Sequence, residues 1–103
     1  MEKIIYSILK ELEDNENRMI LGEKPIIPTK EDYNINSEIY GKIILRLEKD
    51  GLINCKYAKT KGLPSLVLSA EITSRGKIYL KENSKFGKVY NGLKEIKSFL
   101  TLS

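Results

Sequence analysis

The sequence predicts a mainly helical α+β domain in which one β-hairpin interrupts a series of helices. Three observations lead to this fold class. Apolar residues recur at intervals of three and four over much of the chain, as in amphipathic helices. Between residues 53 and 72 the interval changes to two, which is typical of strands. Gly51 separates the two patterns, where a helix needs a left-handed residue in order to end.

The totals fit a single domain. The chain has 103 residues, and we expect one domain over 1–103, with a core over 1–83 and a C-terminal helix over 84–101. A chain of this length buries enough surface for a core without metal or disulfides. The only cysteine, Cys55, excludes an intrachain disulfide and favours a reducing, cytoplasmic location. No stretch has the roughly 18 apolar residues of a membrane span, and no signal-peptide cleavage site follows the N-terminus.

The first helix is predicted over residues 2–15, and the polar turn EDNEN at 13–17 should end it. Its apolar stripe consists of Ile4, Ile5, Ile8, Leu9 and Leu12. Glycine and proline residues exclude a long helix over 19–28, where Ile26 and Ile27 are compatible with a very short strand. Thr29 is suited to capping a short helix over 30–34.

The next long helix is predicted over residues 37–50, with Ser37 as its N-cap. Its buried stripe should consist of Ile39, Ile43, Ile44 and Leu47. Gly51 ends the helix, and we expect Leu52 to fold back onto its last turn.

A β-hairpin follows. On the first strand Ile53, Cys55 and Tyr57 alternate with polar residues. The second strand should place one set of side chains on one face and a second set on the other: Leu66, Leu68, Ala70 and Ile72 against Val67, Ser69 and Glu71. The stretch AKTKGLPS at 58–65 between the strands should be a flexible basic turn.

Two helices should complete the chain. Thr73 caps a helix that carries Ile78, Tyr79 and Leu80, and a last helix starts at residue 83 or 84. The apolar stripe of this last helix is Phe86, Val89, Leu93, Ile96 and Leu100. It either packs on the first helix or forms a dimer seam, and we favour packing within the monomer.

This order of elements is the layout of a winged helix-turn-helix with a β-hairpin wing and two extra C-terminal helices. The helix over 37–50 takes the place of the recognition helix, and AKTKGLPS is the wing tip.

The stretch EITSRGKIYLKENSKFGKVYNGLKEIKSFL at 71–100 resembles the C-terminal half of the YjcQ-like family, small winged-helix proteins often found in phages and prophages of Gram-positive bacteria. The residues that carry the resemblance are Ile72, Thr73, Gly76, Tyr79, Leu80, Glu82, Asn83, Ser84, Tyr90, Gly92, Leu93, Lys94, Glu95, Ile96 and Lys97. EDYNI at 31–35 and Gly51-Leu52-Ile53 are similar too, whereas 13–28 matches weakly. The resemblance implies a winged-helix fold and a phage or prophage origin, and it brings no catalytic residues.

Most catalytic constellations are excluded by composition. The chain has no histidine and no phosphate-binding glycine motif, and one cysteine cannot form a zinc site or a redox pair. Cys55 shares a strand face with Ile53 and Tyr57, so we expect a small core residue rather than a nucleophile. EDNEN lacks the spacing of a calcium loop. We therefore expect no enzyme, no cofactor and no metal.

The charges favour a DNA-binding or regulatory accessory role. Residues 1–41 hold 5 Lys and Arg against 9 Asp and Glu, whereas residues 42–103 hold 13 against 5. Double-stranded DNA would be contacted through the wing and the helix flank, by phosphate contacts that position without specifying a sequence. The candidate residues are Lys42, Arg46, Lys49, Lys56, Lys59 and Lys61. A solvated lysine-rich surface would give the same pattern, and both interpretations stay open.

A protein-docking face is the alternative. At 100° per residue, the outer face of helix 37–50 would hold Glu38, Gly41, Lys42, Leu45, Glu48 and Lys49. This face offers few base-reading side chains. Leu45 would point outward beside a notch at Gly41, with Glu38 and Lys49 at the rim, so that a protein partner or a second copy of the chain could dock there.

Overall fold

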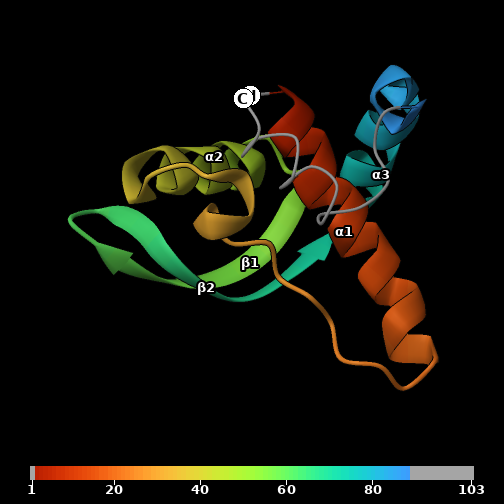
Figure 1. Cartoon of the computed structure of the whole chain (residues 1–103), viewed down its shortest axis with the longest axis horizontal. Coiled ribbons are helices and arrows are strands. Elements are labelled where there is room, and N and C mark those ends of the chain that lie inside the picture. The colour runs from red at the N-terminus through yellow and green to blue at the C-terminus, as the bar shows by residue number, and fades with distance from the viewer. Residues whose placement is uncertain (1, 89–103) are drawn as a thin grey trace.

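The computed structural model describes residues 2–88, with side chains through residue 86. Its elements are α1 (Glu2–Ile20), η1 (Lys30–Tyr33), α2 (Ser37–Lys49), β1 (Ile53–Thr60), β2 (Leu63–Ile72), α3 (Ser74–Glu82) and η2 (Ser84–Lys88). The two strands form one antiparallel hairpin, which runs along α2, while α1 runs from top centre to lower right past the base of the hairpin (Figure 1). The predicted fold class, a winged-helix-like α+β domain, is therefore confirmed.

The core lies where α1, α2, α3 and the base of the hairpin meet. Its central side chains are Leu9 and Leu12 of α1, Leu47 of α2 and Ile53 of β1, all almost fully buried. Burial of each such side chain stabilises the fold by about 1.5–3 kcal/mol. A second, smaller cluster joins α2 to the outer part of the hairpin through Tyr40, Ile44 and Val67.

α1 continues to Ile20, so the turn predicted at 13–17 was wrong. The reason lies in the loop that follows the helix. Asn15 is 4% exposed, and its side chain donates to the Ile26 carbonyl oxygen at 2.7 Å and accepts from the Ile26 N–H at 2.8 Å. Arg18 donates to Asn15 Oδ1 at 2.6 Å and pairs with Glu11. The polar residues of this stretch thus find hydrogen-bond partners in the loop and along α1. They do not need the water that would surround them in an exposed turn.

The loop after α1 begins at Gly22, whose φ of 79° ends the helix. The Glu23 N–H donates back to the Arg18 carbonyl oxygen at 2.7 Å. Residues 26 and 27 form no strand, because the backbone of Ile26 is paired with the Asn15 side chain instead.

The short helix predicted after Thr29 is present as η1. The Asp32 carboxylate accepts from the Thr29 N–H at 2.8 Å and from its hydroxyl at 3.2 Å. Tyr33 ends the helix with its ring in the core and its hydroxyl 3.0 Å from Ser7 Oγ. Asn34, with φ of 54°, then turns the chain toward α2.

The N-cap of α2 lies one residue earlier than predicted. The N-cap is Asn36 rather than Ser37, because the Asn36 side chain accepts from the Ile39 N–H at 2.8 Å. Ile39 was predicted to be buried but lies at the exposed edge of the helix. At the other end Gly51 has a φ of 73°, and the Leu52 N–H donates to the Leu47 carbonyl oxygen at 2.9 Å, as predicted.

The wing is a more regular hairpin than the sequence suggested. Both strands continue through most of 58–65 to a two-residue turn at Lys61 and Gly62, whose φ angles are 55° and 81°. A two-residue hairpin turn matches the right-handed twist of its two strands when both central residues have positive φ. The predicted flexible turn over 58–65 was therefore wrong.

The faces of β2 also differ from the prediction. Val67 is buried, whereas Leu66 and Leu68 are 58% and 61% exposed. The pairing register shifts between Lys56 and Tyr57, which leaves Leu68 without a cross-strand partner. This β-bulge reverses the alternation of faces, because one extra residue moves every later side chain to the other side of the sheet.

α3 is capped as predicted. Thr73 Oγ1 accepts from the Gly76 N–H at 3.0 Å and donates to the Gly51 carbonyl oxygen at 2.6 Å, which ties the end of α2 to the start of α3. Leu80 is buried, but Ile78 is exposed.

Only the beginning of the predicted last helix falls within the described residues, and it is the 3-10 helix η2. Phe86 packs against Tyr6 of α1, with ring centroids 6.1 Å apart. The remainder of the predicted helix over 84–101 lies outside the described residues.

Candidate nucleic-acid interface

The outward face of α2 is not the one predicted from the helical wheel. Gly41 is buried and Leu45 is half-buried, because the wing covers this side of the helix. The exposed side chains are Glu38, Ile39, Lys42, Arg46 and Lys49. The face is therefore rotated toward Arg46, which the wheel had placed on a flank.

Gly41 marks the closest approach of the wing to α2. A Cβ at this position would lie 2.8 Å from the Pro64 carbonyl oxygen and 3.1 Å from Leu63 Cβ. The absence of a side chain lets the hairpin pack directly on the helix. The notch that the sequence suggested beside Leu45 is therefore filled by the wing, and Gly41 is not part of an open surface.

Glu48 also faces the wing rather than solvent. Its carboxylate accepts from the Tyr57 hydroxyl at 2.9 Å and from Cys55 Sγ at 3.6 Å. Burial, followed by the negative charge of Glu48, raises the pKa of the Cys55 thiol to about 11. The thiol is thus neutral at pH 7 and acts as a packed donor. Glu48, which the helical wheel placed on the outer face, is turned toward the wing instead.

The charges that remain on the outward face are only loosely paired. Lys42 Nζ lies 3.0 Å from a Glu38 carboxylate oxygen, and Arg46 Nε lies 3.8 Å from one of Asp50. All four side chains are more than half exposed, and such pairs contribute at most about 1 kcal/mol. Among residues 2–88, no acidic side chain pairs with Lys49. These cations are accordingly available to an external anion.

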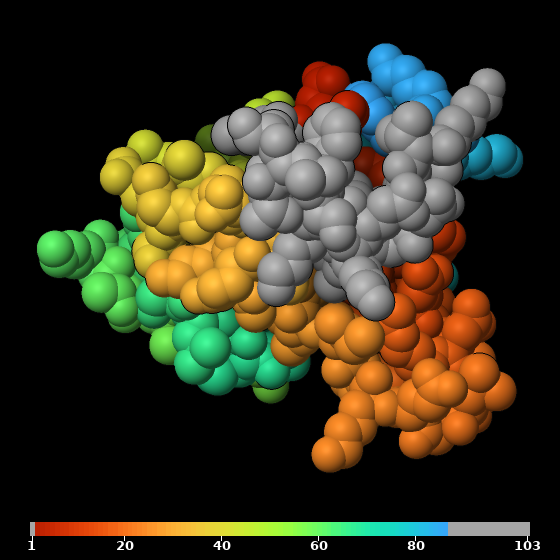
Figure 2. All heavy atoms as spheres, in the orientation of Figure 1, coloured from red at the N-terminus to blue at the C-terminus, as the bar shows by residue number. Residues whose placement is uncertain are grey.

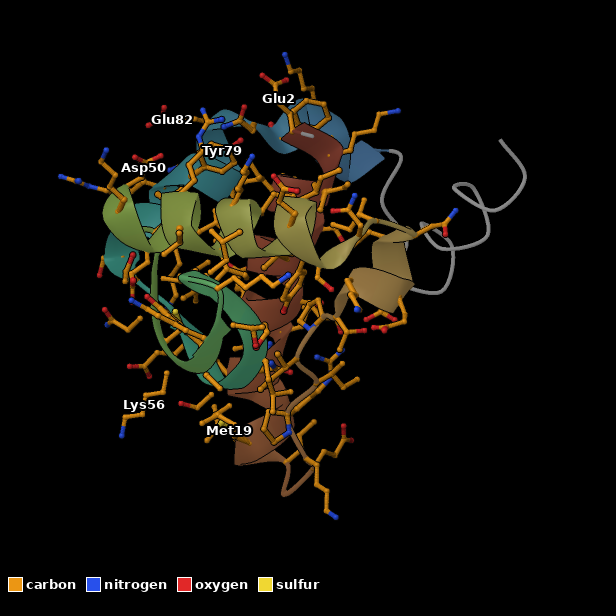
Figure 3. The ribbon with its side chains drawn as sticks, turned by 90° about the vertical axis from the view of Figure 1, so that its left-hand side faces the viewer. Glu2, Met19, Asp50, Lys56, Tyr79 and Glu82 are labelled. Atoms are coloured by element: carbon orange, nitrogen blue, oxygen red, sulfur yellow. The ribbon has the colours of Figure 1, made fainter. Side chains whose placement is uncertain are left out.

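The wing lysines separate into two groups. Lys59 lies over the Tyr57 ring, 5.9 Å from its centroid, on the side of the hairpin that faces α2. Lys61 lies at the wing tip. Lys56 instead points away on the outer side of the hairpin, near Met19 (Figure 3). The structure therefore places Lys59 on the α2-facing side of the wing and Lys61 at its tip, and it separates Lys56 from them.

Arg75 is a cation that the sequence did not single out. Its guanidinium donates to the Asp50 carbonyl oxygen at 3.3 Å, at the C-terminal end of α2. The Thr73 cap, which bonds to Gly51, holds the first turn of α3 in this position. The sequence did indicate that Arg75 would lie in the first turn of α3, because it follows the predicted cap Thr73 by two residues.

A metal site needs clustered ligand side chains, and a membrane span needs a long apolar helix. No group of three or more His, Cys, Asp or Glu side chains among residues 2–88 is arranged to hold a metal ion. No helix in this range is both long and apolar enough to cross a membrane.

The sequence is similar to one family of proteins over most of its length. A family model described as "YjcQ protein" matches residues 6–99. The Bacillus subtilis (strain 168) protein described as "Uncharacterized protein YjcQ" is 30% identical over 101 residues, which cover 96% of each chain. No solved structure matches the chain. Because the family match runs from α1 past η2, and includes both the wing and α2, the chain belongs to the YjcQ family.

Proposed function

We propose that this protein is a DNA-binding or regulatory accessory factor that acts in the cytoplasm without catalysis, and that it is of phage or prophage origin. The observation that carries the proposal is the basic outward face of α2, flanked by the basic wing. Lys42, Arg46 and Lys49 project from the helix, Lys59 lies on the α2-facing side of the wing, and Lys61 lies at the wing tip. Glu48, the acid nearest the wing, is bonded to Tyr57 and turned inward.

The mode of binding follows from the chemistry of these groups. Lysine and arginine on an exposed helix face bind phosphate oxygens, and arginine does so with two parallel hydrogen bonds. The surface ion pairs with Glu38 and Asp50 are weak enough to be exchanged for phosphates. We therefore propose that double-stranded DNA lies across α2 and the α2-facing side of the wing, held mainly by its backbone.

The salt dependence of binding tests this proposal. Neutralisation of about four phosphates gives a slope of about −3.6 in a plot of log affinity against log salt concentration. The variant Lys49→Ala should weaken binding to any duplex and reduce the slope by about 0.9. Fluorescence anisotropy with a labelled duplex, at salt concentrations from about 50 to 200 mM, measures both quantities.

Lys56→Ala is the matched control, because Lys56 lies on the same hairpin but on its outer side. It should leave the affinity and the slope unchanged. Equal losses for Lys49→Ala and Lys56→Ala would show that binding is not localised to the proposed face. Absence of binding to any duplex at about 50 mM salt would refute the proposal.

A second candidate function is docking of a protein on the same face of α2. Ile39 is exposed at one edge of this face and Leu45 is half-exposed at the other. Both side chains flank the charged residues of this face, so a protein partner would make apolar contacts at its edges and ion pairs between them. The partner would be another protein or a second copy of the chain.

The variant Leu45→Glu distinguishes the two functions. If proteins dock here, it should retain its thermal stability and lose its partner in a pull-down. A large loss of thermal stability would instead assign Leu45 to the packing between α2 and the wing. A fall in DNA affinity without loss of a protein partner would favour the DNA-binding role.

A further inference from the structure

A groove lies on the other side of the wing from α2, between the second half of α1 and the base of the hairpin. Its volume is about 700 Å³. Leu12 and Met19 of α1 line one wall, Pro25 and Ile27 of the loop line another, and Leu68 of β2 stands opposite. None of these side chains takes part in the DNA contact proposed above.

The end of α1 beside the groove carries three exposed apolar side chains in succession. Met19 is 64% exposed, and the next two residues, Ile20 and Leu21, are 81% and 73% exposed. The orange end of α1 carries them away from the body of the molecule at lower right (Figure 2). The bulge aims Leu68 outward from the facing strand. Contiguous exposed apolar side chains of this kind mark interaction sites.

The hairpin side of the groove also carries both signs of charge. Lys56 and Glu71 line it from neighbouring positions on the outer face of the hairpin, where Lys56 is paired with Ser69 and Glu71 with Asn54. Neither Lys56 nor Glu71 has an ion pair with any residue among 2–88. Lys56 and Glu71 are therefore both available to a partner. A surface that carries one cation and one anion in the same way would pair with both.

We infer that this groove is the interface for a second copy of the same chain. A surface with an apolar hollow, a projecting apolar tip beside it and both signs of charge is complementary to itself under a twofold rotation. The end of α1 from one copy fills the groove of the other, so that Met19 and Leu68 are covered in both. Lys56 of each copy then faces Glu71 of the second copy, which forms two equivalent pairs around an apolar centre.

Sedimentation velocity on the full chain, from about 1 µM to about 1 mM, tests the inference. The wild-type chain should pass from monomer to dimer in this range. Leu68→Glu should remain monomeric with an unchanged thermal midpoint, because Leu68 is exposed within each copy. Leu66→Glu is the control, since Leu66 is similarly exposed on the same strand but does not line the groove, and it should dimerise like the wild type.

A charge exchange identifies the partner as a second copy. Lys56→Glu and Glu71→Lys should each weaken self-association by roughly two- to fivefold for each pair, because like charges then face one another across the interface. A mixture of these two variants restores both pairs, so it should form mixed dimers as tightly as the wild type dimerises.

The inference is overturned if the wild-type chain stays monomeric throughout. Equal effects of Leu68→Glu and Leu66→Glu, or no preference for mixed dimers, would also overturn it. These outcomes are independent of DNA binding.

Discussion

Single residues decide how the wing is joined to α2. Gly41 leaves room for the Pro64 carbonyl group, and Glu48 receives hydrogen bonds from Tyr57 and Cys55. Each of these contacts links residues that belong to different elements. They also determine which side of α2 is left for a ligand, so the candidate interface depends on residues that do not themselves face it.

The environment of Cys55 predicts how stability changes at alkaline pH. The folded state holds the thiol proton up to a pKa of about 11, against a usual value of 9.0. Between these values the unfolded chain loses the proton while the folded chain retains it, so the free energy of unfolding should fall as the pH rises. Urea unfolding measured between about pH 8 and pH 10 tests this fall.

Cys55→Ala should make this alkaline loss of stability smaller, because the titrating thiol is gone. Glu48→Gln should reduce it only partly, since burial is the larger cause of the raised pKa of Cys55. If the wild type and Cys55→Ala lose stability at the same rate over this interval, the thiol does not contribute.

At the scale of elements, the long helix α1 depends on the loop that returns alongside it. Asn15 binds both the N–H and the carbonyl oxygen of Ile26, as a neighbouring strand would. Arg18 in turn holds the Asn15 side-chain oxygen. The second half of α1 and the loop over 21–28 are therefore one unit, although the loop has no regular structure of its own.

The variant Asn15→Leu should release this loop. Loss of both hydrogen bonds leaves the backbone groups of Ile26 without partners, and the expected cost is about 1–3 kcal/mol in the free energy of unfolding. Hydrogen exchange of the Ile26 amide should accelerate as well. Asn17→Leu is the matched control, because Asn17 is exposed on the same helix, and it should change stability by less than about 0.5 kcal/mol. Equal losses for the two variants would contradict this account.

At the scale of the whole molecule, the acidic first part of the chain is partly neutralised by the fold. Lys10 lies 2.9 Å from Glu13 and 3.5 Å from Asp14, and Lys77 of α3 lies 2.9 Å from Glu16. On α2 the pairs of Lys42 and Arg46 are exposed, and Lys49, Lys59 and Lys61 have no ion pair among residues 2–88. The charge asymmetry of the sequence therefore becomes, in three dimensions, a difference between paired and accessible charges.

The features that sequence analysis predicted correctly are local. The Gly51 stop and the Thr73 cap involve hydrogen bonds between residues a few positions apart, and residue type alone indicates them. The features that it missed depend on distant contacts. The end of α1 depends on Ile26, and the outward face of α2 depends on Pro64 and Tyr57. No helical wheel contains that information, because it assigns the outer face without knowing what packs beside it.

The bulge at Leu68 has a consequence for the length of the chain. It divides the hairpin into a base, where Ile53 is paired with Ile72, and an outer part, where Tyr57 is paired with Val67. Removal of one residue at position 68 would remove this irregularity and leave Val67 facing inward, while the second register shift, between Ala58 and Lys59, would remain. We therefore expect the fold to tolerate a one-residue deletion at position 68, and such a shorter chain should keep its core while losing the projecting leucine.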